Sequence, residues 1–299
     1  MVRGILAQKG PLEARVQEWV ERGDQAIAEL MPLHAPMSEL PGEHRYKRAL
    51  MLLSTACLGS TGSVLHLVEG MRLWDAELIL RSVSEGTAKF AYLLENQATF
   101  TERCIEYRDV LPLIARRRRH TKAAEALNAL RGASDLQTRP YRDLLLTDDE
   151  LADIEAKYPR DVRRRMETRW GFSALVEAIS KPDGVFGLTA RALLHGYSVA
   201  SDLQHMSFDG TEMPLERDMR SVQRRKAIEL AHAAKLISSC YHLTWLRIRV
   251  LLRFLNRPAD ELLYANVRNA ALLAEFDQAE SHWSEIEYPT DISAKEPRP

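Results

Sequence analysis

Two residues of opposite charge lie one helical turn apart in an apolar stretch of the chain. Arg81 and Glu85 fall within residues 75–94, which are otherwise rich in Leu, Ile, Val and Ala. Arg and Glu are rarely buried unless they are paired, and side chains four residues apart on a helix can form an ion pair. We therefore expect both side chains to be largely buried and within salt-bridge distance, as a structural clamp or as half of a functional site.

A histidine at the end of a later apolar stretch could add acid–base chemistry to this pair. His205 lies three residues after Asp202. A histidine titrates near neutral pH and can act as a general acid or base, while Arg81 could stabilise a phosphoryl transition state. Together with Glu85, these residues predict a metal-independent site that cleaves phosphodiesters. The alternative is a polar network that fixes helix packing.

A second pair of residues offers a competing catalytic arrangement. Arg225 and His232 are separated by six residues on one face of a predicted long helix. This spacing resembles the motif of the HEPN ribonucleases, in which four to six residues separate Arg and His. Where those nucleases typically have Asn, Asp or His after the Arg, this chain has Lys226. The resemblance implies Arg225 and His232 as alternative catalytic residues.

Four consecutive arginines suggest a nucleic-acid contact. Arg116, Arg117, Arg118 and Arg119 would point in four directions about 100° apart on a helix, so most must meet solvent or a partner. The net charge of −1, with 41 basic and 42 acidic residues, shows no overall preference for nucleic acid. We expect weak, salt-sensitive binding of RNA or DNA at this run. The alternative is a solvated helix face.

No residue pattern predicts a metal or a cofactor. Glu229 and His232 have a spacing found in di-iron bundles, but those bundles need the motif twice. Glycine-rich phosphate loops, dinucleotide fingerprints and serine nucleophile elbows are absent from the sequence. The three cysteines are odd in number and form no paired motif, which predicts a reducing, cytoplasmic setting.

The elements that must position these residues are helices. Only 14 Gly and 13 Pro interrupt 299 residues, and long stretches without either favour helices over short strands. We predict an all-α, single-domain bundle of about eight helices with no sheet. Its parts are an N-terminal helix and loop at 1–42, a main helical domain at 43–285 and a flexible tail at 286–299.

The helices that carry the candidate residues are predicted at 75–95 and at about 215–255. Segments 32–43 and 132–148 contain turn-forming residues and are predicted to be loops. Ala49 to Val68 has no charged side chain and is long enough to cross a bilayer. It contains many polar residues, so we expect a buried core helix and no membrane partner.

Three short motifs resemble a bacterial helical family described only as domain of unknown function number 5677. The resemblance spans residues 45–255. It implies a helical fold and draws attention to Arg81, Glu85, Ser201 and His205. The motifs are Leu80 to Glu85 followed by Phe90 to Leu94, Trp170 to Ser173, and Tyr197-Ser198 through Ser201 with His205 to Ser207.

Two classes of function fit these features. The arginine run and the Arg and His placements favour a protein that acts on nucleic acid, such as an RNA-cleaving toxin or defence effector. The neutral net charge and the lack of a strong catalytic motif favour a non-catalytic helical binding or scaffold module, with a protein partner or a second copy of the chain. We therefore expect RNA or DNA as the partner in the first case and another protein surface in the second.

Overall fold

The described residues, 10–180 and 192–288, form an all-α structure in the computed structural model, and no strand occurs among them. The all-α prediction is therefore confirmed. The α-helices are α1 (Pro11–Leu30), α2 (His44–Glu69), α3 (Leu73–Leu93), α4 (Phe100–Ile105), α5 (Leu111–Ala129), α6 (Asp135–Arg142), α7 (Asp148–Lys157), α8 (Arg160–Arg169), α9 (Phe172–Ile179), α10 (Ala192–His205), α11 (Phe208–Met219), α12 (Val222–Phe254), α13 (Asp260–Arg268) and α14 (Ala270–Glu287).

The prediction of about eight helices is wrong, because the described residues contain more. Helix α6 occupies the predicted loop 132–148, where Ser134 and Gln137 form a reciprocal cap on the first turn. The predicted helix 215–255 is two helices, because the chain is extended at Arg220 and Ser221. The hydroxyl of Ser221 accepts a hydrogen bond from the backbone N–H of Arg224 and starts α12 anew.

Other differences concern segments with turn-forming residues. The predicted loop 32–43 begins with a 3₁₀ helix at Met31–Glu39. A π-helical segment at Glu106–Val110 leads into α5, which has Pro112 in its first turn. The predicted tail begins inside α14, which ends at Glu287, and its residues 289–299 lie outside the described part of the chain.

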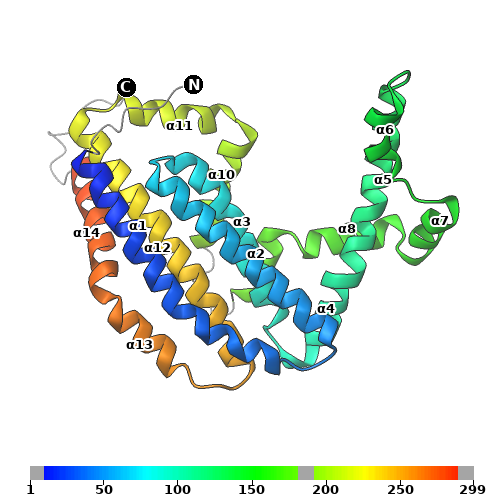
Figure 1. Cartoon of the computed structure of the whole chain (residues 1–299), viewed down its shortest axis with the longest axis horizontal. Helices are drawn as coiled ribbons and strands as arrows, with labels where there is room; N and C mark the ends of the chain where they lie inside the picture. Colours follow the sequence, from blue (N-terminus) through cyan, green and yellow to red (C-terminus); the bar gives the residue numbers. More distant parts are fainter. Residues whose placement is uncertain (1–9, 181–191, 289–299) are drawn as a thin grey trace.

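Helix α12 is the central helix of the main bundle, where α1, α2, α3 and α14 surround it (Figure 1). Between Ala231 and Phe254 most of its side chains are buried, because neighbouring helices cover it on several sides. One core cluster joins α1, α2, α3, α12, α13 and α14. A second cluster joins α2, α3, α4, α9 and α12 at the other end. The N-terminal helix thus packs into the same core as the main domain.

Helices α5, α6 and α7 extend away from the main bundle (Figure 1). Only Ile114 and Ala123 of α5 are buried, and no apolar stripe runs along this helix. Ion pairs to neighbouring helices hold its arginines, as described below. The arm is therefore held together more by polar contacts than by a hydrophobic core of its own.

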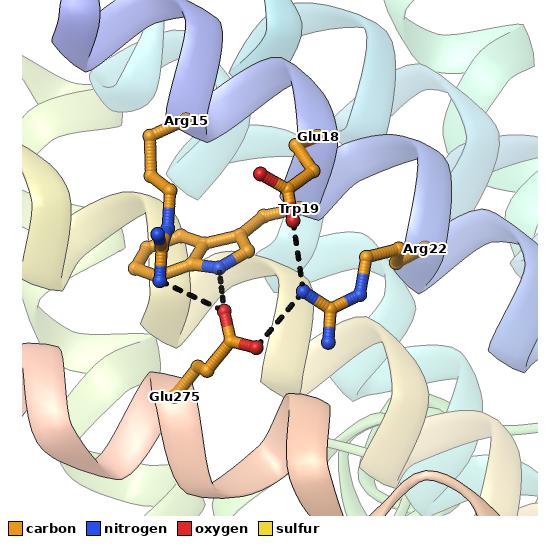
Figure 2. Close-up of polar contacts among 5 residues, drawn as sticks. All are labelled: Arg15, Glu18, Trp19, Arg22 and Glu275. Atoms are coloured by element: carbon orange, nitrogen blue, oxygen red, sulfur yellow. Dashed lines mark hydrogen bonds and ion pairs between the residues drawn. The ribbon is translucent and has the colours of Figure 1, made fainter.

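A carboxylate on α14 joins that helix to α1 (Figure 2). The indole N–H of Trp19 donates to Glu275 Oε2 at 2.8 Å, and Arg15 and Arg22 each contact the same carboxylate at 2.9 Å. The bond from Trp19, together with Arg22 and Arg15, lowers the pKa of Glu275 against the effect of partial burial. An ionised Glu275 thus fixes the position of α14 across three side chains of α1.

Among the described helices, α2 is the one that is long and apolar enough to cross a membrane. Its most apolar window has a mean hydropathy of 1.4, and a third of that window is buried inside the protein. Its buried side includes Tyr46, Leu50, Cys57 and Val64, which belong to the two core clusters. A core helix meets the same length and composition criteria, so this feature is weak evidence for a membrane span.

Candidate functional site

Arg81 of α3 contacts α10 and does not pair with Glu85. Its guanidinium donates to the hydroxyl of Tyr197 at 2.8 Å and to the side-chain oxygen of Gln204. The same guanidinium lies 4.1 Å from the centre of the Tyr197 ring, and Phe172 stacks on that ring at 4.0 Å. The three motifs described above therefore meet here, and the contacts fix α3, α9 and α10 to one another.

Glu85 pairs with a different residue of its own helix. Its carboxylate lies 2.6 Å from Lys89 Nζ, and both side chains are partly exposed. The predicted buried clamp between Arg81 and Glu85 is wrong, because Arg81 reaches to α10 while Lys89 is one turn from Glu85. Glu85 lines a hollow of about 280 Å³ between α2 and α3, together with Cys57 and Tyr107.

His205 and Asp202 lie at the end of α10. His205 is exposed, and Asp202 is half-buried. The backbone carbonyl of Asp202 accepts the N–H of Ser207, and Gly210 approaches this carbonyl too closely for any larger residue. The backbone carbonyl of Asp202 thus helps to fix the turn between α10 and α11. Gln204, the neighbour of His205, is one of the two α10 residues whose side chains Arg81 contacts.

Arg225 and His232 both lie on α12, but they lie near different charged residues. Partial burial raises the pKa of Glu229, and Arg217 and Arg225 act against this shift, so Arg225 lies near Glu229. His232 contacts Glu77 of α3. The structure therefore places the second catalytic pair in two different polar environments along one helix.

Three of the four consecutive arginines pair with carboxylates of neighbouring helices. Arg116 contacts Glu150 at 3.1 Å, Arg117 contacts Glu155 at 2.8 Å, and Arg118 contacts Glu167 at 3.2 Å. Arg119 donates to the backbone carbonyl of Ala115. The run thus holds α7 and α8 against α5, and carboxylates already neutralise much of its charge.

The most deeply buried carboxylate among the described residues lies between two basic side chains of α12. Glu77 is 3% exposed. Its Oε2 is 3.1 Å from His232 Nε2, and its Oε1 accepts from Lys235 Nζ at 3.0 Å. His232 and Lys235 are three residues apart, so they lie on one face of α12. This arrangement joins α3 to α12 through two polar contacts of Glu77.

The protonation states of this group follow from its surroundings. Burial raises the pKa of Glu77, but His232 and Lys235 outweigh it, and the net shift is downward. Burial also lowers the pKa of His232, which the contact with Glu77 only partly offsets. Near neutral pH, Glu77 is therefore ionised and His232 is neutral, so that His232 donates its Nε2–H and Lys235 supplies the countercharge.

A cavity of about 230 Å³ opens beside this group, between α3, α10, α12 and α14. Its walls are mainly apolar and include two tryptophans. Its polar lining consists of Glu77, His232, Lys235 and the exposed Glu280. Its apolar lining consists of Trp74, Val199, Ile228, Ala231 and Trp283.

Three hydrogen-bond donors near the cavity have no acceptor. They are the indole N–H groups of Trp74 and Trp283 and the Nη1 of Arg217, all buried. The Arg217 guanidinium lies 5.3 Å from the centre of the Trp74 ring, and His232 packs edge-on against the same ring at 4.8 Å. A buried donor without an acceptor costs about 1–3 kcal/mol. The described part of the protein therefore supplies no acceptor for these three donors.

The described part of the chain contains no group of three or more His, Cys, Asp or Glu side chains that could hold a metal ion. His232, which shares a helix face with Glu229, is in contact with Glu77. The side chains that line the cavity offer hydrogen bonding, charge pairing and apolar contact.

Several residues of this site were not predicted from the sequence. Glu77 falls in the apolar stretch that drew attention to Arg81, and Lys235 lies one turn after His232. An acidic residue within an apolar stretch, and two basic residues three positions apart, are signals that the sequence shows. Nothing in the sequence indicates that Trp283 and Arg217 lie near Trp74, because these residues come from three helices that are far apart along the chain.

Comparisons of the chain with family models, with curated proteins and with solved structures found no match. The fold is all-α, and the site is a partly apolar cavity beside a buried Glu–His–Lys group. The resemblances to the bacterial helical family and to the HEPN ribonucleases stay predictions.

Proposed function

We propose that this protein is a helical binding module that takes a small, flat, apolar molecule into the cavity between α3, α10, α12 and α14. The observation that carries the proposal is the pairing of an apolar pocket lined by Trp74 and Trp283 with several polar groups at one wall. Ligand sites are typically concave and mostly apolar, with a few polar groups that set orientation. The volume of about 230 Å³ suits a molecule with one or two rings.

The surroundings of the cavity also support binding. Glu77, which is almost fully buried, already has two partners and helps hold α3 and α12 in place without a ligand. A site that is largely formed beforehand loses less free energy on ordering when it binds. The paired arginines of the arm offer less free positive charge for a polyanion than the sequence suggested.

The test uses 2-naphthylmethanol, a neutral probe with two rings, and the NMR signals of the tryptophan indole N–H groups. Trp74→Phe and Trp283→Phe variants assign the two signals of the cavity. We expect both signals to move in a saturable way as the probe is added. Val199→Trp should block the cavity and abolish the shifts, whereas Val222→Trp, at a position that is 60% exposed, should leave them unchanged.

Two results would overturn this proposal. The first is the absence of a saturable shift up to the solubility limit of the probe. The second is a shift that Val199→Trp leaves intact, because the probe would then bind somewhere else.

The competing proposal is an RNA-cleaving effector that uses His232, with Arg225 as the second residue. One observation favours it: a neutral histidine held by a carboxylate beside an open cavity resembles the arrangement of a general base. This proposal predicts cleavage of a single-stranded RNA that His232→Gln abolishes. His66→Gln, at an exposed position of α2, is the matched control. Equal cleavage by wild type and His232→Gln, or none by either, would refute it.

A further inference from the structure

The unpartnered donors near the cavity suggest the chemistry of its ligand. They come from three separate helices: Trp74 from α3, Arg217 from α11 and Trp283 from α14. Each is a donor only, because neither an indole nor a guanidinium can accept a hydrogen bond. A ligand that completes them must therefore supply oxygen or another acceptor.

The charge of Arg217 indicates which kind of acceptor the ligand supplies. Among the described residues, Arg217 forms an ion pair with the neighbouring Asp218, at 3.4 Å, and the Asp218 side chain is 60% exposed. Such an exposed pair contributes little. The Arg217 side chain itself is only 14% exposed and lies against Trp74. By contrast, Lys235 has a buried carboxylate partner in Glu77 at 3.0 Å. Glu229, the other carboxylate near Arg217, is half-buried, so Arg217 lies near the cavity without a fully buried counterion among the described residues.

The walls of the cavity limit the charge that it can take. Five of its lining side chains are apolar or aromatic, and the exposed Glu280 adds a negative charge at the rim. Moving a doubly charged phosphate into such a site would leave one charge unmatched. A carboxylate carries a single charge and fits the planar fork of an arginine.

We propose that the natural ligand is a small aromatic carboxylate, whose ring lies between Trp74 and Trp283 and whose carboxylate takes hydrogen bonds from Arg217 and the two indoles. This inference rests on the proposed binding function and names the ligand class for that same cavity. It also assigns Arg217 of α11 as a specificity residue, although no sequence motif marks it. The stacking of Arg217 on Trp74 links recognition of the charge to recognition of the ring.

The experiment compares two probes with the same rings, naphthalene-2-carboxylate and 2-naphthylmethanol, on the full chain by the same NMR titration. We expect the carboxylate to bind about tenfold more tightly, the size of effect that one charge-assisted contact provides. The carboxylate should also move the indole N–H signals of Trp74 and Trp283 downfield, because each then donates to an anionic oxygen.

Variants then assign the effect to particular residues. Arg217→Met should remove the preference for the carboxylate while leaving the affinity for the alcohol near that of wild type. Trp74→Phe keeps an aromatic ring at this position and removes the N–H, so it should lower the preference partially. Arg225→Met is the matched control, because Arg225 also lies near Glu229 but does not stack on Trp74.

The outcomes separate this inference from the proposed function. Equal binding of the two probes to wild type would overturn the inference and leave the binding module standing. An unchanged preference in Arg217→Met would also overturn it. Failure of both probes to bind would overturn the inference and the proposed function together. The comparison of probes on wild type needs no variant, so it remains decisive if Arg217→Met does not fold.

Discussion

Glu77 and His232 lie 155 positions apart in the sequence, yet the carboxylate of the first is 3.1 Å from the ring nitrogen of the second. Both side chains are largely buried, at 3% and 10% exposure. Their contact joins α3 to the central helix α12 and forms one wall of the cavity. The residues that were expected to form a clamp on α3 are instead bound to other partners.

The Glu77–His232 contact should contribute to stability. We expect Glu77→Met to lower the free energy of unfolding by about 2 kcal/mol, because it leaves the buried N–H of His232 without an acceptor. A double-mutant cycle with His232→Phe should give a coupling energy of about 1–2 kcal/mol. Urea unfolding measures both. Asp75→Asn, in an exposed pair with Arg72, is the control and should change stability by less than about 1 kcal/mol. A coupling energy near zero would contradict the assignment.

A second buried histidine predicts how stability depends on pH. Burial and the nearby Arg247 lower the pKa of His34 to about 4, against an ordinary value of 6.5. Between these values the unfolded chain binds a proton that the folded protein does not, so stability falls as the pH falls from 6.5 to 4. The loss attributable to His34 should reach about 3 kcal/mol, since one pKa unit corresponds to about 1.4 kcal/mol.

Unfolding measured between pH 7.5 and 4 tests this sign. His34→Gln should flatten the decline, whereas His66→Gln, at an exposed position, should leave it as in wild type. The lowered pKa values of Glu77 and His232 act in the same direction, so some decline should remain in His34→Gln. An identical slope in wild type and His34→Gln would show that His34 titrates normally in the folded protein.

Arg247 is a fully buried guanidinium in the central helix. It donates to the hydroxyls of Thr87 and Thr244, and no carboxylate pairs with it among the described residues. Both hydroxyls also donate to backbone carbonyls of their own helices, so each keeps a partner if Arg247 is removed. Burial lowers the pKa of Arg247, which reflects the cost of holding its charge in the core.

We therefore expect Arg247→Met to leave the free energy of unfolding unchanged or to raise it by roughly 1–2 kcal/mol, as for other buried charges replaced by apolar side chains. Chemical denaturation would measure the change. Arg249→Met, which alters an exposed arginine two residues away, is the control for the loss of a positive charge. A loss of more than about 2 kcal/mol in Arg247→Met alone would show that the guanidinium stabilises the core.

The four arginines of the arm still predict weak binding of a polyanion. Residues 111–169, which comprise the arm and α8, contain 14 Lys and Arg against 10 Asp and Glu, so this region is basic although the whole chain is nearly neutral. We expect an RNA oligonucleotide to bind weakly at low salt and to dissociate as salt rises. Changing Arg116, Arg117, Arg118 and Arg119 to Gln should lower this affinity at least severalfold in fluorescence anisotropy.

The carboxylate partners of the arm determine the necessary controls. The fourfold variant also breaks three exposed ion pairs, so its thermal unfolding must be compared with that of wild type. Arg249→Gln on the main bundle should leave RNA binding unchanged. Absence of binding at low salt would indicate that the arginines serve only to hold α7 and α8 on α5.

The all-α class followed from the sequence alone, because helix formation depends on local spacing of apolar residues and on scarce Gly and Pro. The helix that carries Arg81 was predictable for the same reason, and α12 falls within the longer helix predicted at about 215–255. The start of α7 carries a reciprocal cap between Thr147 and Glu150, which depends on local sequence alone. Short helices such as α6 were missed because one or two turns leave little periodicity to detect.

Only the tertiary structure decided which polar side chains meet. Arg81 could pair with Glu85 on its own helix, but packing of α10 against α3 offers it Tyr197 and Gln204 instead. Glu77 contacts His232 and Lys235 because α12 packs against α3. Trp74, Arg217 and Trp283 lie near the same cavity because α3, α11 and α14 pack around it. Local periodicity determines which face of a helix is apolar, whereas the choice among partners depends on how the helices pack.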